Sequence, residues 1–150
     1  MNIDYLIEYR PPRIALTLVL LAIAFHAIIP WQLHPALTAA ATLTATVGFS
    51  LMIRAWWLFK LAGTAICPSE PSTALVIHDV FSLTRNPMYV GITLMLVALA
   101  FAIGSAPFYL AAIGFGIVMN AVFCPYEEQK ARAEFGAAYE AYARSVRRWL

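Results

Sequence analysis

The sequence predicts an all-α integral membrane protein with about four transmembrane helices and a C-terminal amphipathic interfacial helix. Of its 150 residues, 62% are hydrophobic and 12% are charged, and the mean hydropathy is +0.74. A single soluble domain of this length has too little interior to bury so much apolar surface. The apolar residues also gather into four long runs, which is the second observation that indicates a membrane protein.

The four apolar runs are the predicted spans, at about residues 14–31, 35–61, 88–104 and 107–124. Each approaches the roughly 20 residues with which a helix crosses about 30 Å of hydrocarbon. Pro30, Pro35 and Pro107 fall at the joints, where a missing backbone N–H costs least. The first run follows two arginines as in a signal peptide, but the later runs favour a retained first span.

The basic residues predict the orientation of these spans. Lys and Arg are retained on the cytoplasmic side of short loops, and the turns around residues 32–34 and 104–106 contain neither. We therefore expect both termini and the loop 62–87 to be cytoplasmic, in a membrane of the bacterial inner type. Arg54 lies about two helical turns inside the second span, where it can snorkel to the interface or serve as a minor functional candidate.

A helix is predicted over residues 126–150 after the last span. Its larger apolar residues recur at steps of four, three, four and three, which draws one stripe along a helix. The arginines of this segment lie largely off the stripe, which is typical of a helix resting on anionic headgroups. The stripe consists of Phe135, Tyr139, Tyr142, Val146 and Trp149.

Several classes of function receive no support from the sequence. The basic residues form no patch interleaved with exposed aromatics, so nucleic acid is not an expected partner. His26, His34 and His78 are spread over two predicted sides of the membrane, so no metal site is expected. No phosphate-binding glycine motif is present. Cys67 and Cys124 are predicted to be reduced thiols.

The residues that can carry chemistry lie at two distant places on the same predicted side. In TRNPMYVGIT, residues 84–93, Asn86 can cap the third span, Pro87 fits its first position, and Arg85 and Tyr89 flank it. Glu127 and Glu128 follow the fourth span. Because spans three and four form a hairpin, we expect both groups to meet at the membrane edge. This set suits a ligand with an anionic group, a hydroxyl or amine, and a flat or cationic part, as in S-adenosylmethionine.

Three motifs carry a resemblance to a known family. GTAICPSEPSTALV, TRNPMYVG and the segment from EEQKARAEFG to the terminus are similar to the isoprenylcysteine carboxyl methyltransferase and phospholipid methyltransferase group of integral membrane enzymes. The resemblance implies a cytoplasmic S-adenosylmethionine pocket between the last spans and the C-terminal helix. It implies cofactor contacts from Thr73, Leu75, Val76, Phe81, Asn86, Pro87, Tyr89 and Glu128, with Arg85 and Glu127 as the catalytic residues at the polar end of the site.

The chain departs from the pattern of this group in three places. Residues 79–82 read DVFS where relatives often have Gly-Pro-Tyr-Arg, and Asn86 stands where many have histidine. No basic residue directly precedes Glu127, as it tends to do in relatives that methylate a carboxylate.

The resulting hypothesis is methyl transfer from S-adenosylmethionine to a lipophilic acceptor at the cytoplasmic membrane face. The acceptor is either an isoprenoid-linked carboxylate or a lipid amine, so the expected partners are a membrane lipid or lipophilic small molecule and the bilayer itself. A small membrane transporter is one alternative, since it can also carry such charges near its helix ends. A noncatalytic membrane scaffold, in which the stripe from Phe135 to Trp149 serves a partner, is the other. Saturable binding of the cofactor would separate the enzyme from both.

Overall fold

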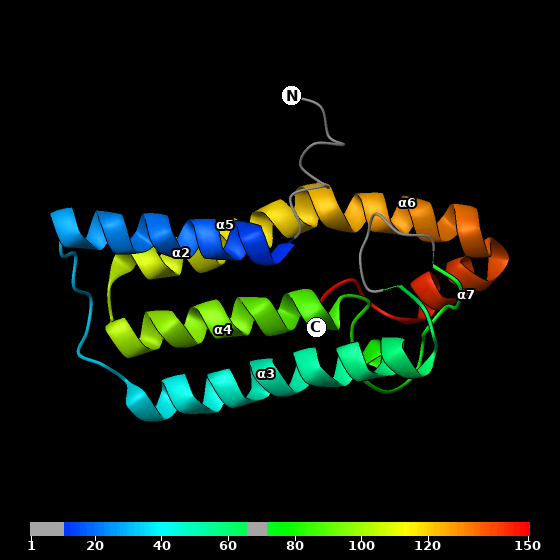
Figure 1. Cartoon of the computed structure of the whole chain (residues 1–150), viewed down its shortest axis with the longest axis horizontal. Helices are drawn as coiled ribbons and strands as arrows, with labels where there is room; N and C mark the ends of the chain where they lie inside the picture. Colours follow the sequence, from blue (N-terminus) through cyan, green and yellow to red (C-terminus); the bar gives the residue numbers. More distant parts are fainter. Residues whose placement is uncertain (1–10, 66–71) are drawn as a thin grey trace.

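The chain is helical in the computed structural model, which describes residues 11–65 and 72–150 (Figure 1). Three stretches, α5, the π-helical turn η2 and α6, follow one another without a break and form one helix from Ala106 to Phe135. The predicted all-α class is confirmed. The elements are α2 (Pro11–Ile28), α3 (Thr38–Leu61), the 3₁₀ turn η1 (Asp79–Ser82), α4 (Pro87–Ile103), α5 (Ala106–Val118), η2 (Met119–Phe123), α6 (Cys124–Phe135) and α7 (Ala137–Ser145).

Three helices of the described chain are long and apolar enough to cross a membrane: α2, α3 and the joined helix Ala106–Phe135. The third predicted span corresponds to α4, which has 17 residues and is shorter. The first span is displaced toward the N-terminus, because α2 ends at Ile28 rather than at residue 31. The second begins at Thr38, three residues after its predicted start at residue 35.

Helix α4 lies between α3 and the row formed by α2 and α5 (Figure 1). The contact between α3 and α4 is close because glycines face each other. A Cβ atom on Gly91 would lie 2.7 Å from the carbonyl oxygen of Gly48, and one on Gly48 would lie 2.8 Å from that of Gly91. Small residues let membrane helices approach to backbone distance. This contact fixes α4, whose first turn belongs to the site described below.

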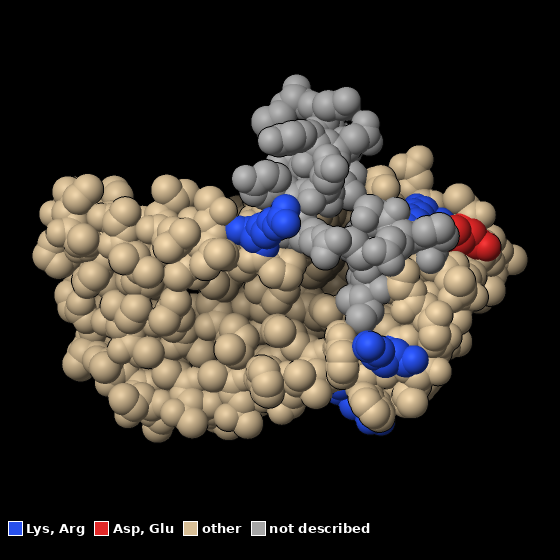
Figure 2. All heavy atoms as spheres, viewed as in Figure 1, with Lys and Arg blue, Asp and Glu red and all other residues tan. Residues whose placement is uncertain are grey.

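The two ends of the bundle differ in charge. At one end, the α2–α3 connection is tied to the α4–α5 turn, where the amide of Leu33 donates to the carbonyl of Gly104 at 2.8 Å. Gly104 has φ of 73°, a conformation that suits glycine at a helix end. The other end holds the start of α2, the end of α3, the loop before α4, and α7. On the face in Figure 2, the charged side chains lie from the middle of the molecule toward this second end.

The prediction of one continuous helix over residues 126–150 is wrong. Gly136, with φ of 51°, separates α6 from α7, and Val146 turns to an extended conformation after Ser145. The expected helix start after Pro125 is also absent, because α6 continues η2 directly. Pro125 has no backbone N–H to donate to the regular helical hydrogen bonds, and the π-helical turn η2 ends at Phe123, two residues before it. Because the chain is extended at Val146, the last residues leave the helix and return toward the start of α4.

Candidate functional site

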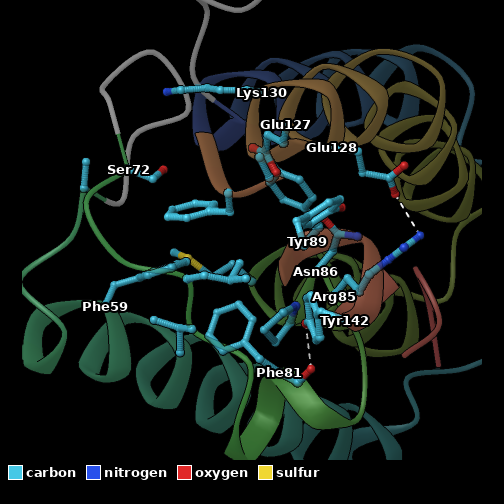
Figure 3. Close-up of a pocket in the computed structure, with 18 of the residues that line it drawn as sticks. Phe59, Ser72, Phe81, Arg85, Asn86, Tyr89, Glu127, Glu128, Lys130 and Tyr142 are labelled. Carbon is cyan, nitrogen blue, oxygen red and sulfur yellow. Dashed lines mark hydrogen bonds and ion pairs between the residues drawn. The ribbon is translucent and has the colours of Figure 1, made fainter. Parts of the chain in front are cut away.

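A cavity of about 390 Å³ lies at the charged end of the bundle, within the range of roughly 300–1,000 Å³ that is common for small-molecule sites. Its walls come from the loop before α4, the first turns of α4, and one face of α6 and α7 (Figure 3). The structure brings nearly all of the predicted site residues together there. Those that line the cavity are Leu75, Val76, Phe81, Arg85, Asn86, Pro87, Tyr89, Glu127 and Glu128.

Thr73 is the predicted site residue that does not line the cavity. Its side chain donates to the carbonyl of Gly63 at 3.1 Å, and its amide donates to the hydroxyl of Thr64 at 3.0 Å. Thr64 is buried and also accepts from the amide of Ala74, at 3.4 Å. Thr73 therefore fastens the loop to the end of α3, and the cavity is lined by the residues that follow it.

The corner before α4 is organised by a buried threonine. The Thr84 hydroxyl accepts from the amide of Asn86 at 3.2 Å and donates to the carbonyl of Arg148 at 2.8 Å. Pro87 begins α4, as predicted, but the side chain of Asn86 makes no capping bond to the helix. Its Nδ2 donates instead to the carbonyl of Arg148, at 3.1 Å. The expected side-chain cap is therefore wrong, since the amide is used to hold the C-terminal residues.

Glu128 is the centre of the charged wall of the cavity (Figure 3). It is 7% exposed, and its Oε1 accepts from Nη2 of Arg85 at 2.9 Å and from Nε of Arg148 at 2.7 Å. Nη2 of Arg148 reaches the other oxygen at 2.9 Å, which completes a bidentate pair. Arg85 also donates to the carbonyl of Ala143, at 3.2 Å. These contacts join the loop before α4, helix α6 and the segment after α7 at one carboxylate.

The apolar part of the joined helix ends before the two glutamates. Residues 106–123 already span about 27 Å at 1.5 Å per residue, close to the thickness of a bilayer core. Glu127 and Glu128 therefore lie beyond the membrane-spanning segment. Burial opposes ionisation of Glu128, but the hydrogen bond from Arg148 and the charges of Arg85 and Arg148 outweigh it and lower its pKa.

Glu127 has the opposite environment. Loss of water contact raises its pKa to about 7, although a hydrogen bond from the hydroxyl of Tyr89 and the charge of Lys130 favour the ionised form. Tyr89 itself is 7% exposed and belongs to the main buried cluster. The two adjacent carboxylates are thus distinguished by their surroundings: Glu128 is held ionised, and Glu127 can exchange a proton near neutral pH.

An aromatic wall faces the carboxylates (Figure 3). Phe81 packs edge-on against Phe59 of α3, with ring centroids 5.1 Å apart. The hydroxyl of Tyr142 donates to the carbonyl of Phe81 at 2.7 Å, which fixes α7 against η1. Burial raises the pKa of this phenol, so it stays a hydrogen-bond donor. The stripe residues Tyr139 and Tyr142 are buried and line the cavity.

Arg54 lies outside this cavity and is paired. Its Nε and Nη2 both reach Oδ2 of Asp79, at 2.9 and 2.5 Å, and this hydrogen bonding lowers the pKa of Asp79. Asp79 has φ of 60°, a conformation that favours glycine. Asp79 begins the DVFS segment, so a residue other than glycine adopts the positive φ of this turn. Arg54 accordingly holds the turn that carries Phe81.

Comparison with known families identifies the family to which this chain belongs. A family model described as phospholipid methyltransferase matches residues 36–138, which include α3, α4, α5, α6 and most of the cavity wall. The chain belongs to the phospholipid methyltransferase family. No curated protein and no solved structure matched the chain.

Membership of the phospholipid methyltransferase family makes the protein a membrane methyltransferase, and enzymes of this family generally use S-adenosylmethionine with lipid-type substrates. The cavity fits such a cofactor in its chemistry. It combines carboxylates, aromatic rings and residues of the loop before α4 with the Nε of Arg85, which is buried without a hydrogen-bond partner in the described chain. Among the described residues, no cluster of His, Cys, Asp or Glu could hold a metal ion.

The sequence patterns did not identify four residues that shape the site: Thr84, Asn120, Tyr142 and Arg148. Asn120 carried a signal, because it is a lone amide within the apolar run 107–124. Tyr142 was placed on the apolar stripe but not in the site. Arg148 carried no signal, since the tail that bends it toward Glu128 was predicted to be helical.

Proposed function

We propose that this member of the phospholipid methyltransferase family transfers a methyl group from S-adenosylmethionine to the amine of a membrane lipid at the cytoplasmic face. The observation that carries the proposal is the Tyr89–Glu127 pair, which places a carboxylate with a pKa of about 7 in a cavity at the edge of the membrane helices. A proton acceptor of this kind is useful to an amine acceptor and unnecessary for a carboxylate acceptor.

The residues that would hold the cofactor come from the loop before α4, the turn η1, the start of α4 and helix α6. Leu75 and Val76 offer loop backbone, Phe81 offers an aromatic face, and the Nε of Arg85 is an available donor. Asn86 and Pro87 shape the floor where α4 begins, and Glu128 can accept further hydrogen bonds because a carboxylate has about four acceptor positions. When bound, S-adenosylmethionine supplies an electrophilic methyl group.

The chain provides the base and the orientation for the reaction. An ammonium headgroup must lose a proton to expose its nitrogen lone pair, and ionised Glu127 accepts that proton. Tyr89 orients the carboxylate by donating its hydroxyl hydrogen. After product release the proton passes from Glu127 to water. The surrounding apolar wall keeps water away from the reacting groups.

The distribution of charge favours an amine over an isoprenoid-linked carboxylate. Arg85 and Arg148 are both committed to Glu128, and Lys130 lies 4.0 Å from Glu134. Among the described residues, Glu127 is thus the carboxylate of the cavity that has no cation in a salt bridge to it, and the charge of Lys130 acts on it only from a longer distance. A cationic headgroup would be attracted there, and a second carboxylate would be repelled.

The position of the cavity supports access from the bilayer. Pro11 and Pro12 at the start of α2 and Ile92 in the second turn of α4 line it, together with the polar residues. Its apolar side therefore lies at the level where two membrane helices begin. An acyl chain can remain among the helices while its headgroup reaches Glu127.

The proposal is tested with purified protein in lipid nanodiscs, methyl-labelled S-adenosylmethionine and one acceptor at a time. We expect label in phosphatidylethanolamine and none in a prenylated cysteine carboxylate. Glu127→Gln should lower kcat by roughly 10²- to 10⁴-fold, the usual contribution of a general base, while cofactor binding by calorimetry stays close to that of the unaltered protein. Absence of saturable cofactor binding would favour a transporter or a scaffold over an enzyme. Label in the prenylated cysteine carboxylate alone would exclude a lipid amine as the methyl acceptor.

A further inference from the structure

We propose that the C-terminal segment 146–149 positions the cofactor side of the cavity, with Arg148 as a positioning residue that acts through Glu128 and the corner before α4. The inference rests on the proposed function, because its readout is cofactor binding. The segment lies beyond residues 36–138, the part of the chain that the family model matches.

The backbone of this segment receives three hydrogen bonds from the corner before α4. The amide of Arg85 donates to the carbonyl of Arg147 at 3.0 Å. The carbonyl of Arg148 accepts from the hydroxyl of Thr84 at 2.8 Å and from Nδ2 of Asn86 at 3.1 Å. Two residues that line the cavity, Arg85 and Asn86, are therefore held by the tail rather than by α4 alone.

The side chain of Arg148 reaches the opposite wall of the cavity. Arg148 donates to both carboxylate oxygens of Glu128. One of them, Oε1, also accepts a hydrogen bond from Nη2 of Arg85. Arg85 and Glu128 are only 13% and 9% exposed in their side chains, so an unpaired charge there is costly. Arg148 thus fixes the orientation of Glu128, which in turn fixes the guanidinium of Arg85.

The far end of the segment is anchored to the joined helix. Oδ1 of Asn120, in the turn η2, accepts from the indole Nε1 of Trp149 at 2.9 Å and from Nη1 of Arg148 at 3.2 Å. Trp149 also packs against the buried cluster that contains Tyr89 and Phe123. The segment is therefore tied to α4, η2 and α6 at once, and it cannot shift without moving the charged wall.

The neighbouring residue offers a matched control. Arg147 carries the same charge at the next position, but its side chain is exposed and has no polar partner in residues 11–65 and 72–150. Only its carbonyl contacts the corner. Arg148→Gln and Arg147→Gln therefore remove the same charge from the same segment, and they differ in the contact to Glu128.

The experiment measures the cofactor dissociation constant, kcat and both KM values for the full chain in nanodiscs, together with the unfolding temperature. We expect Arg148→Gln to raise the dissociation constant and KM for S-adenosylmethionine by roughly tenfold or more, with a smaller effect on KM for the lipid. Arg147→Gln should leave these values unchanged. Arg148→Lys should recover part of the affinity, because it restores the charge without the bidentate geometry.

Two outcomes would overturn the inference: equal cofactor affinity in Arg147→Gln and Arg148→Gln, or equal losses for cofactor and lipid in Arg148→Gln. If Arg148→Gln fails to fold, Trp149→Phe tests the same anchor, since it keeps the packed ring and removes the bond to Asn120. An unchanged cofactor affinity in that variant would then overturn the inference. Failure of the unaltered protein to bind the cofactor would instead contradict the proposed function.

Discussion

At the scale of single residues, the site depends on two adjacent carboxylates that face different neighbours. Arg85 and Arg148 stabilise the ionised form of Glu128, whereas Glu127 accepts a hydrogen bond from the hydroxyl of Tyr89. Their pKa values are therefore driven apart, one below and one above the usual value for glutamate. Such a separation is typical of sites that keep one acid as an electrostatic partner and the other for proton exchange.

This separation predicts the pH dependence of the reaction. The base form of Glu127 is populated above its pKa of about 7, so kcat/KM for the lipid should rise as pH increases through 7. In Tyr89→Phe the hydrogen bond that favours ionisation is lost, and the rise should move to higher pH. The measurement is kcat/KM against pH at saturating cofactor and constant ionic strength.

Glu127→Gln provides the control for this profile, because it keeps the size of the side chain and removes the titration. Its residual activity should lack the rise near pH 7. A profile that is the same in the unaltered protein and in Glu127→Gln would exclude Glu127 as the titrating group. Folding has a related dependence: the raised pKa means that the folded state holds the proton more tightly, so this group's contribution to stability falls as pH rises from about 4.5 to about 7.

Most residues of the site could be predicted from the sequence, but several of their partners could not. Arg85 to Tyr89 lie at the start of α4, and the glutamate pair follows the end of the apolar run 107–124; hydropathy locates both boundaries. The roles of Asn86 and Glu128 depend on Arg148, which reaches them through a turn of the backbone after Ser145. Nothing in the spacing of side chains encodes that turn, since a helical stripe continues through it.

At the scale of elements, the contact between α3 and α4 depends on Gly48 and Gly91. A methyl group on Gly91 would meet the Gly48 carbonyl at 2.7 Å and Cγ of Met52 at 2.6 Å, so the helices would have to separate. We expect Gly91→Ala to destabilise the fold by about 1–3 kcal/mol, the common cost of overpacking. The measurement is thermal unfolding in detergent, followed by circular dichroism.

Gly116 in α5 is the matched control for this substitution. A Cβ atom there would meet nothing within 4 Å, and alanine forms helices better than glycine. Gly116→Ala should therefore leave the unfolding temperature unchanged or raise it slightly. Equal effects of the two substitutions would show that the close contact between α3 and α4 does not limit stability.

The limits of the helices show which physical signals the sequence contains. Hydropathy located each apolar run to within a few residues, because burial in lipid depends on composition averaged over many positions. It could not show that α5, η2 and α6 are continuous, since Pro125 and the charges after it are typical of a helix end. Gly136 is the position where the chain breaks instead, and one glycine is a weak signal by itself.

At the scale of the whole molecule, charge is distributed along the bundle axis. The described basic residues lie toward the end that carries the cavity, and the turns around Leu33 and Gly104 carry none. By the positive-inside tendency, the cavity should face the cytoplasm. Substituted cysteines can test this orientation, because Leu33 and Arg144 are both exposed and lie at opposite ends.

For that test, Leu33→Cys and Arg144→Cys are made in a Cys67→Ser background, where Cys124 is buried and unreactive. A membrane-impermeant maleimide should label Cys at position 33 in spheroplasts of a bacterial host. It should label position 144 only in inverted vesicles. The reverse pattern would place the cavity on the outer face, and it would contradict the cytoplasmic site that we propose.

The π-helical turn Met119–Phe123 has a further consequence for the whole molecule. A π-helix closes each turn with one more residue than the usual ladder, so it absorbs a residue without turning the chain beyond it. If this stretch were a regular α-helix, Glu127 and Glu128 would be rotated by about 100° around the helix axis, relative to the side chains of α5. The π-helical turn therefore sets the rotation of α6 relative to α5. In this way one continuous helix presents apolar residues to the bilayer and the two glutamates to the cavity.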